Sequence, residues 1–452
     1  MTIGPHLVRT VQHFFPQFND WLDAFPDRRH PERLTYHRRF LLWIGLFLFL
    51  CKLGSRRQID FQLSEVGAFV LANLNRLART QQTTMPVNKT LDDYLAWLDT
   101  APLTELRRQM IYRLIRMRVL QAARLQGRYV VLIDATGYLV FRHRHCPHCL
   151  TRQSGATTLY MHQVLEAKLL GPGGMVLSIA TELIDNRDLA DCPKDAGEEK
   201  RKQDCELKAL RRLVARLRQE FPQLPMCISG DGLYACGAVF EIAKEYNLSF
   251  ICVFKPGRMP ALWREFQDLL KLCPEQKVEV QTPQKVRQVY RWVNDLNYQD
   301  SEGRQWQVNA IECEETHPDG TKGKWAWLTW QKVTAKTVQE VASKGGRQRW
   351  CIENQGFNVQ KNSGMNLEHA YSEGEHFAVY YLLLQIAHIL LQLLEKGSLL
   401  RQLAQQQGKS SAVALFGSLK NIAERLLESL RNLLWPDEAY VRMPIQIRFD
   451  SS

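Results

Sequence analysis

The sequence predicts a mixed α/β fold, in which a mixed sheet is covered by helices and preceded by a helical segment. Three observations predict it. Strand and helix patterns alternate from Gly127 onward, residues 276–331 carry only strand patterns, and residues 1–125 have helical spacing. A sheet whose strands are joined partly by turns and partly by helices contains both antiparallel and parallel pairs.

The length and charge of the chain narrow the class of protein. The chain has 452 residues, of which 45% are hydrophobic and 23% charged, so we expect a globular protein of two or three units and exclude a disordered one. Its formal net charge of +12 favours a polyanionic partner, because Lys and Arg release counterions when they contact phosphates. The alternative is a basic soluble enzyme without such a partner.

Residues 1–125 are expected to form a helical, DNA-binding domain. The apolar run Phe40–Cys51 is shorter than the ~20 residues that a membrane-spanning helix needs, so we expect a buried helix there and no membrane partner. A turn and a second helix are expected over residues 54–80. An arginine cluster precedes the apolar run: Arg28, Arg29, Arg33, Arg38 and Arg39. This arrangement suits a helix-turn-helix, and a helical hairpin with a solvated basic face is the alternative.

The cysteines and the N-terminus point to the cytoplasm. The first residues lack the apolar core and the cleavage site of a secretory signal. The chain has 11 cysteines, an odd number, and several stand in apolar runs, such as Cys227, Cys236 and Cys252. Buried free thiols in a reducing compartment fit this pattern better than a disulfide framework does.

Residues 126–275 are expected to form most of the central sheet. Strand patterns occur in RYVVLIDATG, LYMHQVLEAKLL and GMVLSIATEL, and the turn sequence GPGG separates the last two. An amphipathic helix follows in DCELKALRRLVARLRQEFP. The strand PMCISGDG, the helix GAVFEIAKEY and the strand SFICVFK complete the order β-β-β-α-β-α-β. This order describes a five-stranded mixed sheet with flanking helices.

In the second half of the chain, strand patterns are followed by helical patterns. Residues 276–331 are expected to be an all-β insertion, because they are rich in Val, Trp and Tyr and contain turn sequences. Residues 332–396 return to helical patterns and are assigned to the same core. Residues 397–452 are expected to be a C-terminal helical tail.

Three carboxylates are the candidate catalytic residues. Asp134 and Asp231 each end an apolar strand, and sites form at the carboxyl ends of strands in such sheets. Small neighbours leave room for a metal and a phosphate beside them. Glu353 lies four residues after Arg349 on a predicted helix over residues 349–361, so both share one face. The alternatives are turn or cap aspartates and an exposed Arg–Glu pair, which contributes only about 0.3–0.5 kcal/mol.

Three carboxylates of this kind can hold two divalent ions. Hard oxygen ligands select Mg²⁺ or Mn²⁺ over softer metals. Two such ions, about 3.5–4 Å apart, activate a water or a 3′-hydroxyl and stabilise the leaving oxygen of a phosphodiester. The set therefore suits phosphoryl transfer on nucleic acid.

The segments LIDATGY, SGDGLYACG and RWCIENQGFNVQKNSGMNLEH resemble the three catalytic blocks of DDE transposases from bacterial insertion sequences. The likeness covers about residues 127–396. It implies an RNase H-like core, a β-rich insertion between the second and third acids, and metal ligands at Asp134, Asp231 and Glu353. It further implies a nucleoid-associated enzyme that binds double-stranded transposon ends and target DNA, with two protomers in the DNA complex.

The third block departs from the family at two positions. A subset of the family has the signature Tyr-x2-Arg-x3-Glu-x6-Lys. Arg349 and Glu353 match it, whereas Gly346 replaces the tyrosine and Gln360 replaces the lysine. Lys361 follows one residue later, about 80° from the face of Glu353. Arg349 is expected to bind a DNA phosphate bidentately, and Lys361 is the second candidate for a phosphate contact.

Aromatic residues supply a further expectation. Trp325, Trp327 and Trp330 lie at the end of the β insertion, where related enzymes stack an aromatic ring on a flipped base. Base stacking tolerates any sequence, because every base has a π-face. The alternative is core packing, which we expect for at least two of the three.

Cysteines and histidines form a candidate structural zinc site. Cys146 and Cys149 have C-x2-C spacing within RHRHCPHCL, and tetrahedral zinc needs four ligands. The candidates to complete the set of four ligands are Cys192, Cys205 and His162. The alternative is a turn with exposed thiols.

The resemblance leaves three functions open. The first is a transposase that cuts element ends and joins them to target DNA. The second is an RNase H-fold nuclease that cuts without strand transfer. The third is an inactive, transposase-derived regulator that only binds DNA.

Overall fold

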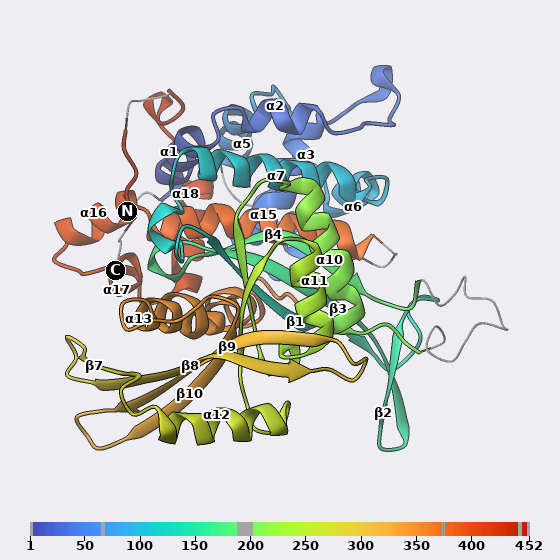
Figure 1. Cartoon of the computed structure of the whole chain (residues 1–452). Helices are drawn as coiled ribbons and strands as arrows, with labels where there is room; N and C mark the ends of the chain where they lie inside the picture. Colours follow the sequence, from blue (N-terminus) through green and yellow to red (C-terminus); the bar gives the residue numbers. More distant parts are fainter. Residues whose placement is uncertain are drawn as a thin grey trace.

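A mixed β-sheet runs through the computed structural model, with helices on both of its faces (Figure 1). The structure describes residues 3–64, 68–187, 202–372, 374, 376–441 and 445–449. Within these residues the sheet has ten strands in the order β2-β3-β1-β5-β6-β10-β9-β8-β7, and β4 pairs with β3. The strands are β1 (Tyr129–Phe141), β2 (Leu150–Ser154), β3 (Thr157–Leu170), β4 (Val176–Ile184), β5 (Met226–Gly230), β6 (Ser249–Val253), β7 (Lys277–Gln281), β8 (Arg287–Gln299), β9 (Gln305–Thr316) and β10 (Lys322–Thr329).

The first half of the sheet confirms the predicted mixed sheet and the predicted order of its strands and helices along the chain. β1 pairs antiparallel with β3, and β3 pairs antiparallel with β4. On its other side β1 pairs in parallel with β5, and β5 pairs in parallel with β6. The parallel pairs follow from the helices between these strands, α10 (Glu206–Glu220) and α11 (Gly237–Glu245), which return the chain to the same end of the sheet.

The expectation of a five-stranded sheet is wrong, because the insertion continues the central sheet. β10 pairs antiparallel with β6, with Trp327 opposite Val253 and Thr329 opposite Ile251. β9, β8 and β7 then follow by antiparallel pairing. Without β10, the outer edge of β6 would present unpaired backbone groups, and an added strand satisfies them. The hairpin strand β2 and the helix α12 (Pro260–Leu272), which packs on β8, were not expected from the sequence.

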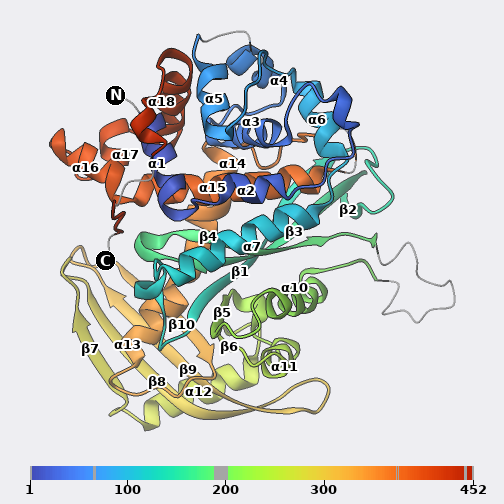
Figure 2. The ribbon, with the colours of Figure 1, turned by 90° about the horizontal axis from the view of Figure 1, so that it is seen from above.

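Helices cover the sheet in two layers. Figure 2 shows α7 (Thr100–Arg116) and α15 (Phe377–Lys396) on one side of β1, β3 and β4, and α10 and α11 on the other. The remaining helices are α1 (Gly4–Phe14), α2 (Phe18–Asp23), α3 (Arg38–Leu50), α4 (Arg57–Ile59), α5 (Val70–Ala78), α6 (Asn88–Ala96), α13 (Val338–Glu340), α14 (Asn358–Asn362), α16 (Ser398–Gln406), α17 (Ala412–Phe416) and α18 (Leu419–Asn432). Shorter turns of other helix types connect several of them.

The helix predicted over residues 349–361 belongs to a longer helical run with unusual turns. The run begins at α13 and continues through η6 (Val341–Gly346), η7 (Arg347–Arg349) and η8 (Ile352–Phe357) to α14. η6 and η8 are π-helical, and η7 is a 3-10 turn. Single π-helical turns within a helix occur frequently at functional sites. η8, which carries Glu353, lies against β1 and β4.

Two apolar helices form the centre of the helical layer. α3 buries every residue from Phe40 to Leu50, which confirms the predicted buried helix. Within the described residues, the stretch Phe377–Gln406 is the one helical segment long and apolar enough to cross a membrane, and 94% of its apolar window is buried inside the fold. α15, which begins this stretch, packs against α3, α7 and β4, so it is a core helix of the structure.

The N-terminal and C-terminal segments pack together. The single second helix predicted over residues 54–80 is wrong: α4 and the π-helical η2 (Asp60–Ser64) end before a turn that leads into α5. α5 then meets the tail, since the amide of Asn73 donates to the carbonyl oxygens of Leu430 (3.0 Å) and Leu433 (2.8 Å). The fully buried Trp435 donates to the carbonyl oxygen of Ser429 at 3.1 Å.

Candidate active site

Two of the predicted acids come from neighbouring parallel strands. The pairing of β1 with β5 places Leu132 opposite Ser229, and Asp134 and Asp231 each follow two residues later. Asp231 is the first residue after β5, as predicted, and its Oδ1 accepts a hydrogen bond from the Leu233 amide at 2.8 Å. The two carboxylates therefore leave the sheet at the same edge, on adjacent strands.

Asp134 does not end its strand, contrary to the expectation. β1 continues to Phe141, because β3 keeps pairing with it and places Asp134 opposite Glu166. What ends before Asp134 is the parallel pairing with β5, whose last partners are Leu132 and Ser229. One side of β1 is therefore open at Asp134, although its strand goes on.

The third acid is joined to the first by an arginine. Nη1 of Arg349 lies 2.8 Å from Oε1 of Glu353 and 3.5 Å from Oδ2 of Asp134. The Arg349 side chain is 10% exposed, which distinguishes it from the exposed ion pair that was the alternative. Its Nε is buried without a hydrogen-bond partner among the described residues. The helical run thus brings Glu353 to β1 through this guanidinium.

A fourth carboxylate, which the sequence did not reveal, lies in the same place. Glu206 is the first residue of α10, and the Tyr234 hydroxyl, just after Asp231, donates to its Oε1. Burial, together with the charge of Asp231, raises the pKa of Glu206 although the Tyr234 hydrogen bond opposes the shift. An acid in the first turn of a helix is a common feature, so nothing in the sequence marked Glu206 as a site residue.

The pKa of Asp134 is shifted by its burial and by the other charged groups of this site. Burial, and then the negative charges of Glu353, Glu206 and Asp231, raise the pKa of Asp134 to about 7 against the opposing charge of Arg349. Neighbouring like charges and desolvation both disfavour the ionised form of a carboxyl group. The site thus carries more negative charge than its one arginine balances.

The acids are grouped more loosely than a closed metal cage. Among the described residues, His145, Cys146 and His162 have ligand atoms that all lie within 4.8 Å of one another, and none of the four acids belongs to this group. Mutual repulsion keeps carboxylates apart, and Arg349 contacts both Asp134 and Glu353 but balances only one negative charge. Side-chain rotation of Glu353, whose side chain is 49% exposed, is the available adjustment.

The two departures in the third block have structural explanations. A Cβ atom built on Gly346 would lie 2.5 Å from Cε2 of the Trp327 indole, so this tryptophan fills the space beside the position of the family's tyrosine. Gln360 is fully buried and donates to Oε1 of Gln385 at 2.9 Å. The same Oε1 atom accepts a hydrogen bond from the buried Lys168 ammonium at 2.8 Å. A lysine at position 360 would bury a second positive charge beside Lys168, whereas an amide adds none.

The residues predicted to contact DNA phosphates and bases differ in their burial and in their partners. Lys361 forms an ion pair with Glu368 at 2.7 Å and remains partly exposed. Trp327 is 2% exposed and belongs to the core, whereas Trp330 packs edge-on against Phe250. Trp325 is half-buried, and the Arg347 guanidinium lies 3.8 Å from the centroid of its ring. Of the three tryptophans, Trp325 keeps a partly open ring beside a basic group.

Glu353 is followed in the chain by three other acids that are alternative candidates for the third position, Glu368, Glu373 and Glu375. The Glu368 side chain is 59% exposed and forms an ion pair with Lys361 at 2.7 Å. Glu373 and Glu375 lie outside the described residues.

A second cluster gathers the predicted zinc ligands. Cys146 and Cys149 lie between β1 and β2, and His162 on β3 is the candidate that joins them. Cys205 is exposed, and Cys192 lies outside the described residues. None of the described cysteines forms a disulfide.

No protein-family model matches the chain, and no curated protein matches it. The function is therefore inferred from the geometry of the site.

Proposed function

We propose that the chain is a DDE transposase, which hydrolyses phosphodiester bonds at the ends of a DNA element and joins those ends to target DNA. The observation that carries the proposal is the placement of Asp134 and Asp231 at the same end of the adjacent parallel strands β1 and β5, with Glu353 joined to Asp134 through Arg349. Reactions of this kind require little of the protein except positioning and charge stabilisation.

The sheet supports an RNase H-like core as the scaffold. Three antiparallel strands in the order β4-β3-β1 are followed by the parallel strands β5 and β6, which α10 and α11 connect. The insertion lies between Asp231 and Glu353 in the chain, as the resemblance implies, and its strands extend the sheet beyond β6. The third acid then returns on a helix that packs over β1.

The donor set fits hard divalent cations. Asp134, Asp231, Glu353 and Glu206 offer only oxygen ligands, and such ligands favour Mg²⁺ or Mn²⁺. Burial, and then the charges of the neighbouring acids, raise the pKa of Asp134, and a bound cation would oppose this shift. When bound, such ions would activate the attacking oxygen and stabilise the leaving oxygen.

The chain's own groups supply the rest of the chemistry. Asp134 and Asp231 would hold the cations, because the paired strands β1 and β5 position both carboxylates. Arg349 holds Glu353 by a 2.8 Å hydrogen bond, and its guanidinium would also offer a bidentate donor to a phosphate. Tyr234 orients Glu206 beside Asp231 through its hydroxyl.

The charge of the chain supports double-stranded DNA as the partner. The net charge of +12 supplies the long-range attraction, and Arg347 with Trp325 offers a basic and aromatic contact close to Arg349 in the chain. Two copies of the chain in one complex would hold the two ends of an element, and such a complex forms in the cytoplasm on the nucleoid.

The test uses full-length protein and the genomic DNA that flanks its coding sequence on both sides. Labelled fragments of these flanks are incubated with a supercoiled target plasmid in Mg²⁺ or Mn²⁺, and joined products are resolved on a gel. We expect joining by the wild type and by the exposed control Asp268→Asn, and a loss of at least about 100-fold for Asp231→Asn and Glu353→Gln.

Each other outcome overturns the proposal in a defined way. Cleavage without joining identifies a nuclease of the same fold. Binding without cleavage by the wild type identifies a DNA-binding regulator. Full activity of Asp231→Asn removes the assignment of the catalytic acids.

A further inference from the structure

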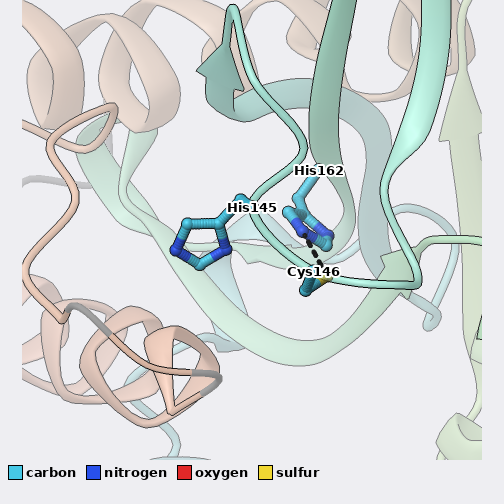
Figure 3. A group of neighbouring side chains, drawn as sticks. All are labelled: His145, Cys146 and His162. Carbon is cyan, nitrogen blue, oxygen red and sulfur yellow. Dashed lines mark hydrogen bonds between the residues drawn. The ribbon is translucent and has the colours of Figure 1, made fainter.

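We propose that Cys146, Cys149, His162 and His145 bind one structural zinc ion, which fastens the loop after β1 to β3. This inference is independent of the proposed DNA chemistry. It depends on a second group of side chains, which lie in the loop after β1 and on β3. Figure 3 shows the Cys146 and His162 side chains directed at one another, with His145 beside them.

The distances between the ligand atoms match a tetrahedral metal site. The two sulfur atoms of Cys146 and Cys149 lie 3.8 Å apart, and Nε2 of His162 lies 3.3 Å from one sulfur and 3.4 Å from the other. Tetrahedral zinc with Zn–S bonds of about 2.3 Å and Zn–N bonds of about 2.0–2.1 Å separates two sulfurs by about 3.8 Å, and sulfur from nitrogen by about 3.5 Å. Three edges of the tetrahedron are thus already formed.

The fourth ligand comes from the same loop. A ligand nitrogen of His145 lies within 4.8 Å of the ligand atoms of both Cys146 and His162. The His145 ring stacks on Phe141, with centroids 4.5 Å apart, and this contact holds it beside the cluster. The set then contains two thiolates and two imidazoles, a composition that zinc accepts in structural sites.

The backbone prepares the two cysteines for one ion. Cys146-Pro-His-Cys149 forms a tight turn, in which the Cys149 amide donates to the Cys146 carbonyl oxygen at 3.5 Å. Asn186 fixes the turn from β4's side, because its backbone amide donates to the His148 carbonyl oxygen (2.8 Å) and its side-chain amide to the Cys149 carbonyl oxygen (3.0 Å). His162 is held on β3, opposite Leu139 of β1.

Burial favours a metal over free thiols in this place. Cys146, Cys149 and His162 are 7%, 2% and 1% exposed, and Phe377 covers the His162 ring at a centroid distance of 4.6 Å. The Sγ–Sγ separation of 3.8 Å is too long for a disulfide, which requires about 2.05 Å.

The ion would have a mechanical role. Four protein ligands close a zinc site to water and substrate, so the site is structural rather than catalytic. It joins the loop at residues 142–149 to β3 and, through Phe377, to the start of α15. β1 is the strand that carries Asp134, so the zinc site would brace the far end of the strand that carries the first acid.

The test measures metal in full-length protein purified without chelator. Elemental analysis is expected to find about one zinc per wild-type chain, and Cys146→Ser and His162→Ala to retain less than a tenth of it. Cys273→Ser and His30→Ala are matched controls outside the cluster, and they should keep full occupancy. His145→Ala should lower zinc affinity, whereas the neighbouring His148→Ala should not.

A second measurement uses only the wild type, so it does not depend on the folding of variants. Replacing zinc by Co²⁺ should give the intense visible bands of a tetrahedral site and a thiolate charge-transfer band. Wild-type protein without zinc and without these cobalt bands overturns the proposal, as does a Cys146–Cys149 disulfide found by mass spectrometry. Loss of zinc in His148→Ala but not in His145→Ala overturns the assignment of the fourth ligand.

Discussion

Asp134 should destabilise the metal-free protein at neutral and alkaline pH. Burial and three neighbouring carboxylates raise its pKa from 3.8 to about 7 in the folded chain. A raised pKa means that the folded state binds the proton more tightly than the unfolded state does. The contribution of Asp134 to the free energy of unfolding is therefore fully present below about pH 4 and is lost as the pH rises to about 7. Asp134→Asn removes this titration and keeps a side chain of the same size.

The structure sets the magnitude of the effect. A change of pKa from 3.8 to about 7, at 1.36 kcal/mol per pH unit, corresponds to about 4 kcal/mol once the group is fully ionised. The Asp134 side chain is only 16% exposed, so solvent screens little of it. Between about pH 5.5 and about pH 8 the expected loss is about 2 kcal/mol. The charge contact with Arg349 forms as Asp134 ionises, and the pKa of about 7 already includes it.

The assay compares thermal unfolding of wild type, Asp134→Asn and the exposed control Asp268→Asn in chelator. For a chain of this length, about 2 kcal/mol corresponds to a shift in Tm of about 2 °C. We expect the Tm of the wild type to fall by that amount relative to Asp134→Asn between the two pH values, and Asp268→Asn to follow the wild type. Saturating Mg²⁺ should reduce the difference, because the cation competes with the proton. Identical pH dependence of wild type and Asp134→Asn would refute the reasoning.

Four further substitutions test neighbouring features. Gly346→Ala places a Cβ against the Trp327 indole and should cost about 1–3 kcal/mol of unfolding free energy in chemical denaturation; an unchanged midpoint contradicts this packing. Gln360→Ala breaks a fully buried amide network and should cost about 1–3 kcal/mol, whereas Lys361→Ala should leave the midpoint within about 0.5 kcal/mol. In DNA-binding titrations Lys361→Ala should instead lower affinity and reduce the salt dependence by about one counterion, and an unchanged slope excludes a phosphate contact. Arg349→Lys should keep charge but lose bidentate geometry, so joining should fall by about 10-fold or more without loss of DNA binding.

The sequence predicted the strands and helices around the site because their patterns are strongly periodic. The order of β1, β3, β4, β5 and β6 followed from apolar runs and turn sequences, and Asp231 stands where the end of its strand placed it. Asp134 was expected at a strand end but lies within β1. The strand continues because β3 pairs with it beyond Asp134, and the local sequence does not reveal such pairing.

Features that depend on tertiary contacts were beyond sequence patterns. The insertion extends the central sheet only because the edge of β6 accepts β10, and edge pairing has no local signature. Glu206 joins the acids through a helix start and a tyrosine hydroxyl. Gly346 departs from the family signature because Trp327, nineteen residues earlier in the chain, occupies the space beside it.

The central claim is that three acids bind divalent cations, and Mn²⁺ in crystals of the full chain tests it most directly. Anomalous scattering locates Mn²⁺ without reference to activity. The account predicts density within coordination distance of Asp134, Asp231 and Glu353, with Arg349 moved away from Asp134. Absence of bound Mn²⁺ at saturating concentration, or coordination by Glu206 in place of Glu353, would contradict it.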